Sequence, residues 1–164
     1  MKHMPFPTIG MLGLMLAAPA AAERVIAPPP VSDGYDWAIR VTEDRVSSAI
    51  LAYEVDGTDD QPLNFTCEEG GNRIFAGISG GDPKLSEIVL TSGPQTLRVR
   101  GKTEAPEGEM PDFTSLEIAG DSAFIRAFAA NGWLWMSANG KLTGMTGTAA
   151  GKRAIQRFVT FCTR

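Results

Sequence analysis

The chain has 164 residues, 43% of them hydrophobic, and a formal net charge of −4 at pH 7. This acidic balance argues against general affinity for nucleic acid or anionic membrane, because both attract basic surfaces. The length suits one domain with a substantial hydrophobic core.

The first 22 residues have the pattern of a cleavable export signal. Lys2 precedes an uncharged apolar run, and Ala20-Ala21-Ala22 supplies small residues for a signal peptidase just before Glu23. The alternative is a membrane anchor, but the run is too short to cross about 30 Å of hydrocarbon and has no basic stop-transfer flank. We therefore predict that residues 1–22 are removed and that the protein is periplasmic or secreted, with no integral membrane segment in the mature chain.

The mature chain is predicted to be a linker followed by one domain. Residues 23–36 contain Pro28-Pro29-Pro30 and few apolar side chains, which is typical of an extended linker. Residues 37–164 are punctuated by Gly and Pro, and the segments between them alternate apolar and polar residues as antiparallel strands do. The predicted fold class is α+β: a mainly antiparallel sheet, shaped as a sandwich or a barrel, with two helices.

Strands are predicted where alternate residues are apolar. The clearest such sets are Trp37, Ile39 and Val41; Leu63, Phe65 and Cys67; Ile74, Ala76 and Ile78; and Leu97 with Val99. Residues 46–55 are ambiguous, and we assign them as a strand because Asp56-Gly57 ends them as a turn would. The clearest hairpin has Asn139-Gly140 at its centre, since this pair suits a type I′ turn, and it places Trp135 opposite Gly144.

Two segments are predicted to be helices. In the first, Asp121 can act as the N-cap, Phe124, Ile125 and Phe128 share one face, and Asn131-Gly132 ends the helix. The second begins near Thr148 and is amphipathic. Its apolar face carries Ala154, Ile155, Phe158 and Cys162. We expect this last helix to pack across the sheet.

The mature chain is predicted to contain no histidine, because His3 lies within the signal. Ser-His-Asp and Cys-His catalysis both require an imidazole, and zinc hydrolase sites usually have histidine ligands. These classes of enzyme are therefore disfavoured. No catalytic residue and no cofactor is predicted.

The acidic pairs Asp59-Asp60 and Glu68-Glu69 leave a paired-carboxylate glycosidase formally open. Both pairs lie beside predicted turns, where solvated charge is the commoner reason for adjacent carboxylates. Residues 56–60 resemble part of a calcium loop but lack the later glutamate that an EF-hand requires. A hairpin turn is the better interpretation, and no metal site is predicted.

Two groups of residues are candidate binding surfaces. Trp133 and Trp135 share one strand face, where two rings could hold a sugar or a peptide; the alternative is that both rings belong to the core. The polar face of the last helix carries four basic residues that could dock a partner, namely Lys152, Arg153, Arg157 and Arg164. The alternative is a solvated face whose cations complement the helix dipole.

The two cysteines, Cys67 and Cys162, are predicted to form one disulfide. Export places the chain in an oxidising compartment. Cys67 lies on the apolar side of its strand and Cys162 on the apolar side of the last helix, so both thiols point inward. The alternative is two separate buried thiols.

The layout of the chain resembles small exported bacterial one-disulfide β proteins, such as type VI secretion accessory proteins. The resemblance rests on the signal, the early Trp37 strand, Cys67 at a strand end, Phe124-Ile125 followed by Gly132-Trp133-Leu134, and the closing segment from Ala154-Ile155-Gln156-Arg157-Phe158 to Cys162. It implies a non-enzymatic envelope protein. Thr66 stands where an arginine is expected before the strand cysteine, so no functional residue is carried over.

The leading expectation is a non-catalytic exported envelope protein that binds another protein or the cell-wall glycan. One alternative is an inhibitor of a secreted hydrolase, a role that small disulfide-linked β-domains can fill. Another is a histidine-free carbohydrate-active enzyme.

Overall fold

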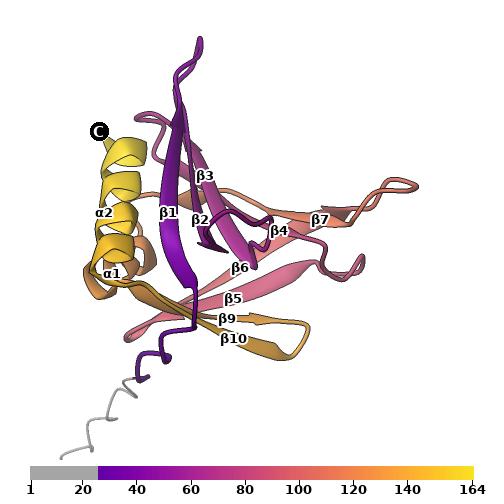
Figure 1. Cartoon of the computed structure of the whole chain (residues 1–164). Helices are drawn as coiled ribbons and strands as arrows, with labels where there is room; N and C mark the ends of the chain where they lie inside the picture. Colours follow the sequence, from indigo (N-terminus) through magenta and orange to yellow (C-terminus); the bar gives the residue numbers. More distant parts are fainter. Residues whose placement is uncertain (1–25) are drawn as a thin grey trace, which may run out of the picture.

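The computed structural model describes residues 26–164; the predicted signal, residues 1–22, and its cleavage point at Glu23 lie outside the described residues. The described part contains the following strands and helices (Figure 1): β1 (Tyr35–Thr42), β2 (Ser48–Val55), β3 (Leu63–Glu68), β4 (Arg73–Ser79), β5 (Glu87–Ser92), β6 (Gln95–Glu104), β7 (Asp112–Ser115), β8 (Ile118–Ala119), α1 (Ala123–Asn131), β9 (Trp133–Ala138), β10 (Lys141–Thr146) and α2 (Ala149–Thr163). No helix in this part is long and apolar enough to cross a membrane.

The strands form one continuous antiparallel sheet that curves into a nearly closed barrel. Its order is β1-β2-β3-β4-β7-β6-β5-β9-β10, and β8 pairs with β4. Figure 1 shows β1 to β4 crossing over the layer made by β5, β6, β9 and β10, with α2 standing beside β1. The predicted fold class, a mainly antiparallel α+β structure with the C-terminal helix packed on the sheet, is confirmed.

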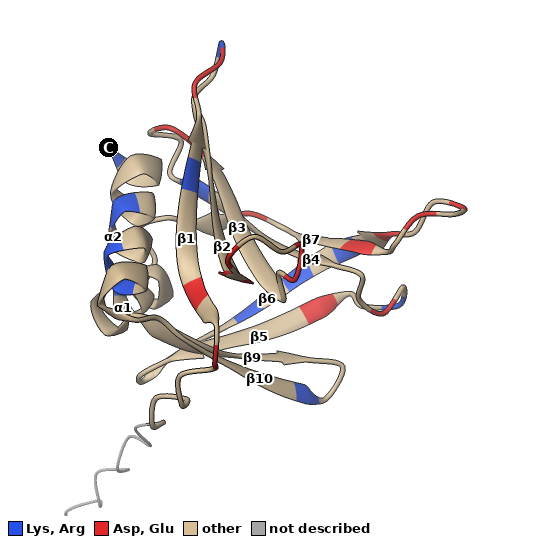
Figure 2. Cartoon of the chain, viewed as in Figure 1, with Lys and Arg blue, Asp and Glu red and all other residues tan. Residues whose placement is uncertain are grey.

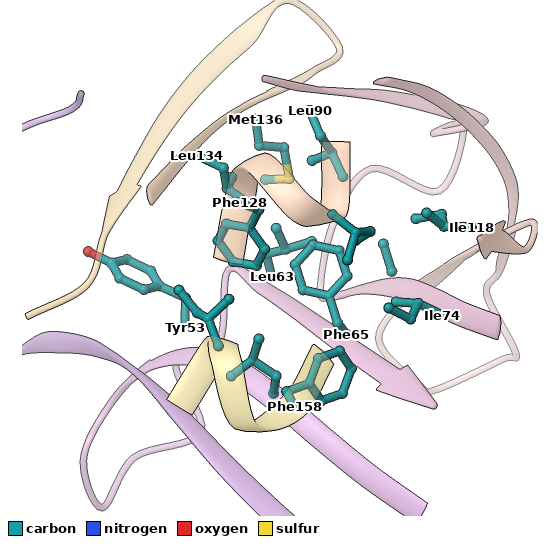
Figure 3. Close-up of a cluster of buried hydrophobic side chains, with 14 of the residues drawn as sticks. Tyr53, Leu63, Phe65, Ile74, Leu90, Ile118, Phe128, Leu134, Met136 and Phe158 are labelled. Carbon is teal, nitrogen blue, oxygen red and sulfur yellow. The ribbon is translucent and has the colours of Figure 1, made fainter. Parts of the chain in front are cut away.

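The core lies between the two halves of the sheet and is closed by the helices. The alternating residues of β3 and β4 that were predicted to face inward are all buried. The rings of Phe65 and Phe128, from β3 and α1, have centroids 5.7 Å apart. Figure 3 shows these two rings together with Phe158 of α2, so side chains from the sheet and from both helices meet in one cluster.

The predicted N-cap of the first helix is wrong by one residue. Ser122 is the N-cap of α1, and its side chain accepts a hydrogen bond from the Ile125 N–H at 3.4 Å. Asp121 lies just outside the helix, where its side chain accepts a hydrogen bond from Asn72 Nδ2. The predicted end of the helix is correct: Gly132 follows α1 with a φ of 79°, which a glycine adopts without steric cost.

The second helix begins where predicted and is held by the predicted disulfide. The Thr148 hydroxyl accepts hydrogen bonds from the N–H groups of Ala150 and Gly151. The residues predicted for its apolar face are all buried. Cys67 and Cys162 are bonded, with Cα atoms 5.8 Å apart, so the two-thiol alternative is excluded.

The predicted turns are also present. Trp135 pairs with Gly144 across the β9–β10 hairpin, whose turn residues Asn139 and Gly140 both have positive φ. Residues 56–60 connect β2 to β3 as a hairpin turn, closed by the hydrogen bond from the Thr58 N–H to the Val55 carbonyl. Strand β2 begins at Ser48, two residues after the start of the predicted segment.

Candidate functional site

Three of the four acidic residues singled out in the sequence, Asp60, Glu68 and Glu69, make structural contacts at the surface. Asp60 accepts a hydrogen bond from the Tyr35 hydroxyl, and this bond raises the pKa of that phenol. Glu68 lies 3.5 Å from an Arg73 nitrogen, and Glu69 pairs with Arg164. Among residues 26–164, no three His, Cys, Asp or Glu side chains gather as a metal site would require.

The four basic residues of the last helix are divided between two sides of α2. The Lys152 side chain lies beside Gly132, on the side where Gln156 reaches the carbonyl of Ala129 in α1. Arg153, Arg157 and Arg164 are exposed and spaced along a single stripe of the helix. Figure 2 shows these basic residues along α2, which stands next to β1.

The N-terminal end of α2 is fixed against β1. Asp36 Oδ1 accepts a hydrogen bond from the Thr148 N–H at 2.9 Å, and Asp36 Oδ2 accepts one from the Thr148 hydroxyl. A side chain at Gly151 would overlap this carboxylate, so the helix approaches the strand as closely as a glycine allows. Helix and strand are therefore in direct contact at this end.

Towards its C-terminal end, α2 leaves β1 partly uncovered. Trp37, Ile39 and Val41 share the inward face of β1, and their exposure rises along the strand from 3% at Trp37 to 43% at Val41. A hollow of about 440 Å³ opens between this end of β1 and the helix. We call it the β1–α2 groove; its walls include Ile39, Val41, Arg157, Thr160, Phe161 and Arg164.

The backbone of β1 along this groove faces away from its neighbouring strand. β1 ends the strand order, with β2 as its neighbour in the sheet. The Trp37 N–H donates to the Asp36 side chain, so it points away from β2. Because alternate residues of a strand direct their N–H and C=O groups to the same side, Ile39 and Val41 also present these groups to the open edge.

The basic side chains of the groove lie on its helix wall, whereas its two acidic residues, Glu43 and Glu69, lie outside the helix. Arg164 stacks over the Phe161 ring at 5.1 Å and pairs with Glu69. Within the described residues Arg157 forms no ion pair. Glu43 lies at the end of the groove, just beyond β1. The middle of the helix wall therefore carries an uncompensated positive charge.

Trp133 and Trp135 are half-buried on the outer face of the β9–β10 hairpin, opposite to the core. Part of this face is covered by the segment predicted as a linker. The Trp135 indole N–H donates to the Ala27 carbonyl at 3.0 Å, and Pro29 is buried against the hairpin. The tryptophan pair is therefore neither part of the core nor a fully exposed binding platform.

A second hollow, of about 330 Å³, lies between the end of β4 and the β9–β10 hairpin. Leu85 and Met136 form part of its apolar lining, and Asp82 accepts a hydrogen bond from Asn139 Nδ2 at its rim. This hollow could not be predicted from the sequence, because its walls come from segments that are distant in the chain.

Comparison of the chain with protein-family models, with curated proteins and with solved structures finds no match.

Proposed function

We propose that this is an exported, non-catalytic protein that binds another protein by adding an extended, acidic segment of that partner to the free edge of β1. The observation that carries the proposal is the β1–α2 groove, in which an open strand edge and a positively charged helix wall face the same space. The disulfide supports export, because such bonds persist in oxidising compartments outside the cytoplasm.

The strand edge supplies the main-chain part of the recognition. Proteins usually protect long edge strands with Pro, Lys, bulges or a covering element. β1 has eight residues and contains neither Pro nor Lys, and α2 covers its first half closely. The second half, at Ile39 and Val41, offers unpaired N–H and C=O groups to an added strand.

The side chains of the groove supply the selectivity. Val41 and Phe161 form apolar walls, against which an apolar side chain of the partner would pack. Arg157 favours a carboxylate, because its guanidinium can donate two parallel hydrogen bonds to one. The predicted ligand is therefore a short extended segment in which apolar and acidic residues alternate.

Site-specific photo-crosslinking tests this proposal directly. The photoreactive residue p-benzoylphenylalanine replaces Thr160, which is exposed in the groove, or Thr66, which is exposed on β3 and serves as the control. We expect a specific adduct in the envelope from position 160 and none from position 66. Mass spectrometry of the adduct then identifies the partner segment, and a synthetic peptide of that segment gives its affinity for the full chain.

Matched variants then separate a groove ligand from other occupants. Arg157→Glu should lower the affinity for the peptide roughly tenfold. Lys152→Glu, on the other side of the same helix, should have little effect on that affinity. Val41→Pro removes an edge N–H and should also weaken binding, whereas Val41→Thr keeps that N–H. An adduct with a second copy of this chain or with glycan, or equal effects of the two charge reversals, would contradict the proposal.

A further inference from the structure

The segment between the predicted signal and the domain, residues 26–31, is seated on the outer face of the β9–β10 hairpin. Two hydrogen bonds hold its backbone: the Trp135 indole N–H donates to the Ala27 carbonyl at 3.0 Å, and the Thr146 hydroxyl donates to the Pro29 carbonyl at 2.6 Å. Pro29 is buried, while Pro28 and Pro30 on either side are exposed. We call residues 26–31 the proline strap.

The hairpin is shaped to receive Pro29. A side chain at Gly144 would overlap the Pro29 ring and would approach Trp135 Cζ3 to 2.9 Å, so glycine leaves the seat open. Gly144 lies opposite Trp135 in the hairpin, which places the seat beside the indole ring. The seat therefore has a glycine beneath the Pro29 ring and an aromatic ring beside it, and the Trp135 indole and the Thr146 hydroxyl supply its two hydrogen-bond donors.

These are the features by which proteins recognise proline-rich segments. Consecutive prolines favour an extended helix that makes no internal hydrogen bonds, so its carbonyls are available to outside donors. The segment is already stiff, and little conformational entropy is lost when aromatic side chains and indole N–H donors bind it. The same physics applies whether the segment belongs to this chain or to another.

Apolar surface continues beyond the strap. Leu142 is 62% exposed and Ile26 is 41% exposed, and with Trp135 they line a hollow of about 320 Å³. The strap therefore fills only part of the surface, and a longer proline-rich segment with a further apolar residue would cover more of it.

We propose that the outer face of the β9–β10 hairpin is a binding surface for proline-rich extended segments, and that the proline strap occupies it in cis. A partner segment gains access only when the strap is displaced. Because the strap competes for the seat, the apparent affinity of any other segment is its intrinsic affinity multiplied by the fraction of time that the seat is free.

A peptide with the sequence of residues 26–31 tests this, labelled with fluorescein and titrated onto the full-length mature chain. Pro29→Asp should release the strap and raise peptide affinity roughly tenfold or more above that of the wild type. Pro30→Asp introduces the same charge at an exposed neighbour and should bind the peptide as weakly as the wild type does. A peptide with serine at the three proline positions should bind none of the proteins.

Two results would overturn the proposal: equal affinities of Pro29→Asp and Pro30→Asp for the peptide, or equal binding of the serine peptide. A measurement on the wild-type chain covers the case in which Pro29→Asp does not fold. The Trp135 indole proton should exchange slowly with solvent and show a nuclear Overhauser contact with Ala27, whose carbonyl it reaches. Fast exchange without that contact would equally overturn the proposal, because the strap would then not be seated.

Discussion

The carboxylate of Asp36 in β1 accepts hydrogen bonds from both the backbone N–H and the hydroxyl of Thr148, the N-cap of α2. α2 has no acidic residue in its own first turn, and the N-terminus of a helix carries a partial positive charge. Asp36 therefore supplies, from a strand 112 residues away, the negative charge that the sequence of the helix lacks. The same contact holds the N-terminal end of α2 against β1.

Asp36→Ala should lower the free energy of unfolding by about 1–2 kcal/mol, since it removes both a helix cap partner and a favourable charge. Asp36→Asn should cost less, because the amide keeps one acceptor. Urea unfolding without reductant measures both. The control is Asp33→Ala, since Asp33 is exposed and makes no side-chain hydrogen bond or ion pair in the described part of the chain. Equal losses for Asp36→Ala and Asp33→Ala would contradict the prediction.

Removal of the disulfide should cost about 4–5 kcal/mol of unfolding free energy, because the bond closes a loop between residues 95 apart in sequence. The variant Cys67→Ala/Cys162→Ala and the reduced wild-type chain should both unfold at lower urea concentration. Dithiothreitol should shift the wild type and leave the double variant unchanged. Detection of two free thiols in the denatured, unreduced wild-type protein would refute the bond.

The C-terminal end of α2 depends on the turn between β3 and β4. The Gly70 N–H donates to the Phe161 carbonyl at 3.0 Å, and the Asn72 N–H donates to the Cys162 carbonyl at 2.8 Å. These bonds satisfy carbonyls that have no partner within the helix. Together with the disulfide, they fix this end of α2 against the sheet.

Gly70→Ala should therefore destabilise the protein more than Gly57→Ala does. Both glycines have positive φ, so each alanine has a backbone cost of about 1 kcal/mol. A side chain at Gly70 would also overlap the Arg164 carbonyl, whereas one at Gly57 would meet nothing within 4 Å. Thermal unfolding of the two variants should give a lower Tm for Gly70→Ala. Equal values would show that the turn adjusts without disturbing the end of α2.

The parts of the fold that depend on local chemistry could be predicted from the sequence. Asn139-Gly140 determined the hairpin register, because the type I′ turn aligns Trp135 with Gly144. Thr148 marked the start of α2, and the apolar spacing of the helix identified its buried face. The inward-facing cysteines then had one possible intramolecular pairing, which the structure contains.

The candidate sites depended on contacts between distant segments and could not be predicted in the same way. The sequence places Arg157 and Lys152 on one polar helix face, but only packing against β1 and α1 shows that they lie on different sides. Asp36 lies in a segment predicted as linker, with no local sign that it contacts Thr148. The seat for Pro29 requires a glycine and a tryptophan more than 100 residues away. No pattern in the sequence shows that these residues are close in space.

The close approach of α2 to β1 reverses the expected sign of one substitution. Gly151 lies within α2, where replacing glycine by alanine normally stabilises a helix by about 0.5–1 kcal/mol. Here the new Cβ would overlap Asp36 Oδ1 and lie 3.1 Å from the Trp37 nitrogen. Either the carboxylate must leave Thr148, or the helix must move away from the strand. We therefore expect Gly151→Ala to lower the free energy of unfolding by about 1–2 kcal/mol, the size of the lost cap interaction.

A double-mutant cycle in urea unfolding separates this overlap from helix propensity. In the Asp36→Ala background the carboxylate is gone, so the cost of Gly151→Ala should fall by about 1 kcal/mol. Ala150→Gly, at the exposed neighbouring position, measures the difference in helix propensity between alanine and glycine in this helix. It should lower the free energy of unfolding by about 0.5–1 kcal/mol. If Gly151→Ala instead stabilises the protein by the amount that Ala150→Gly destabilises it, then α2 does not approach β1 as closely as described.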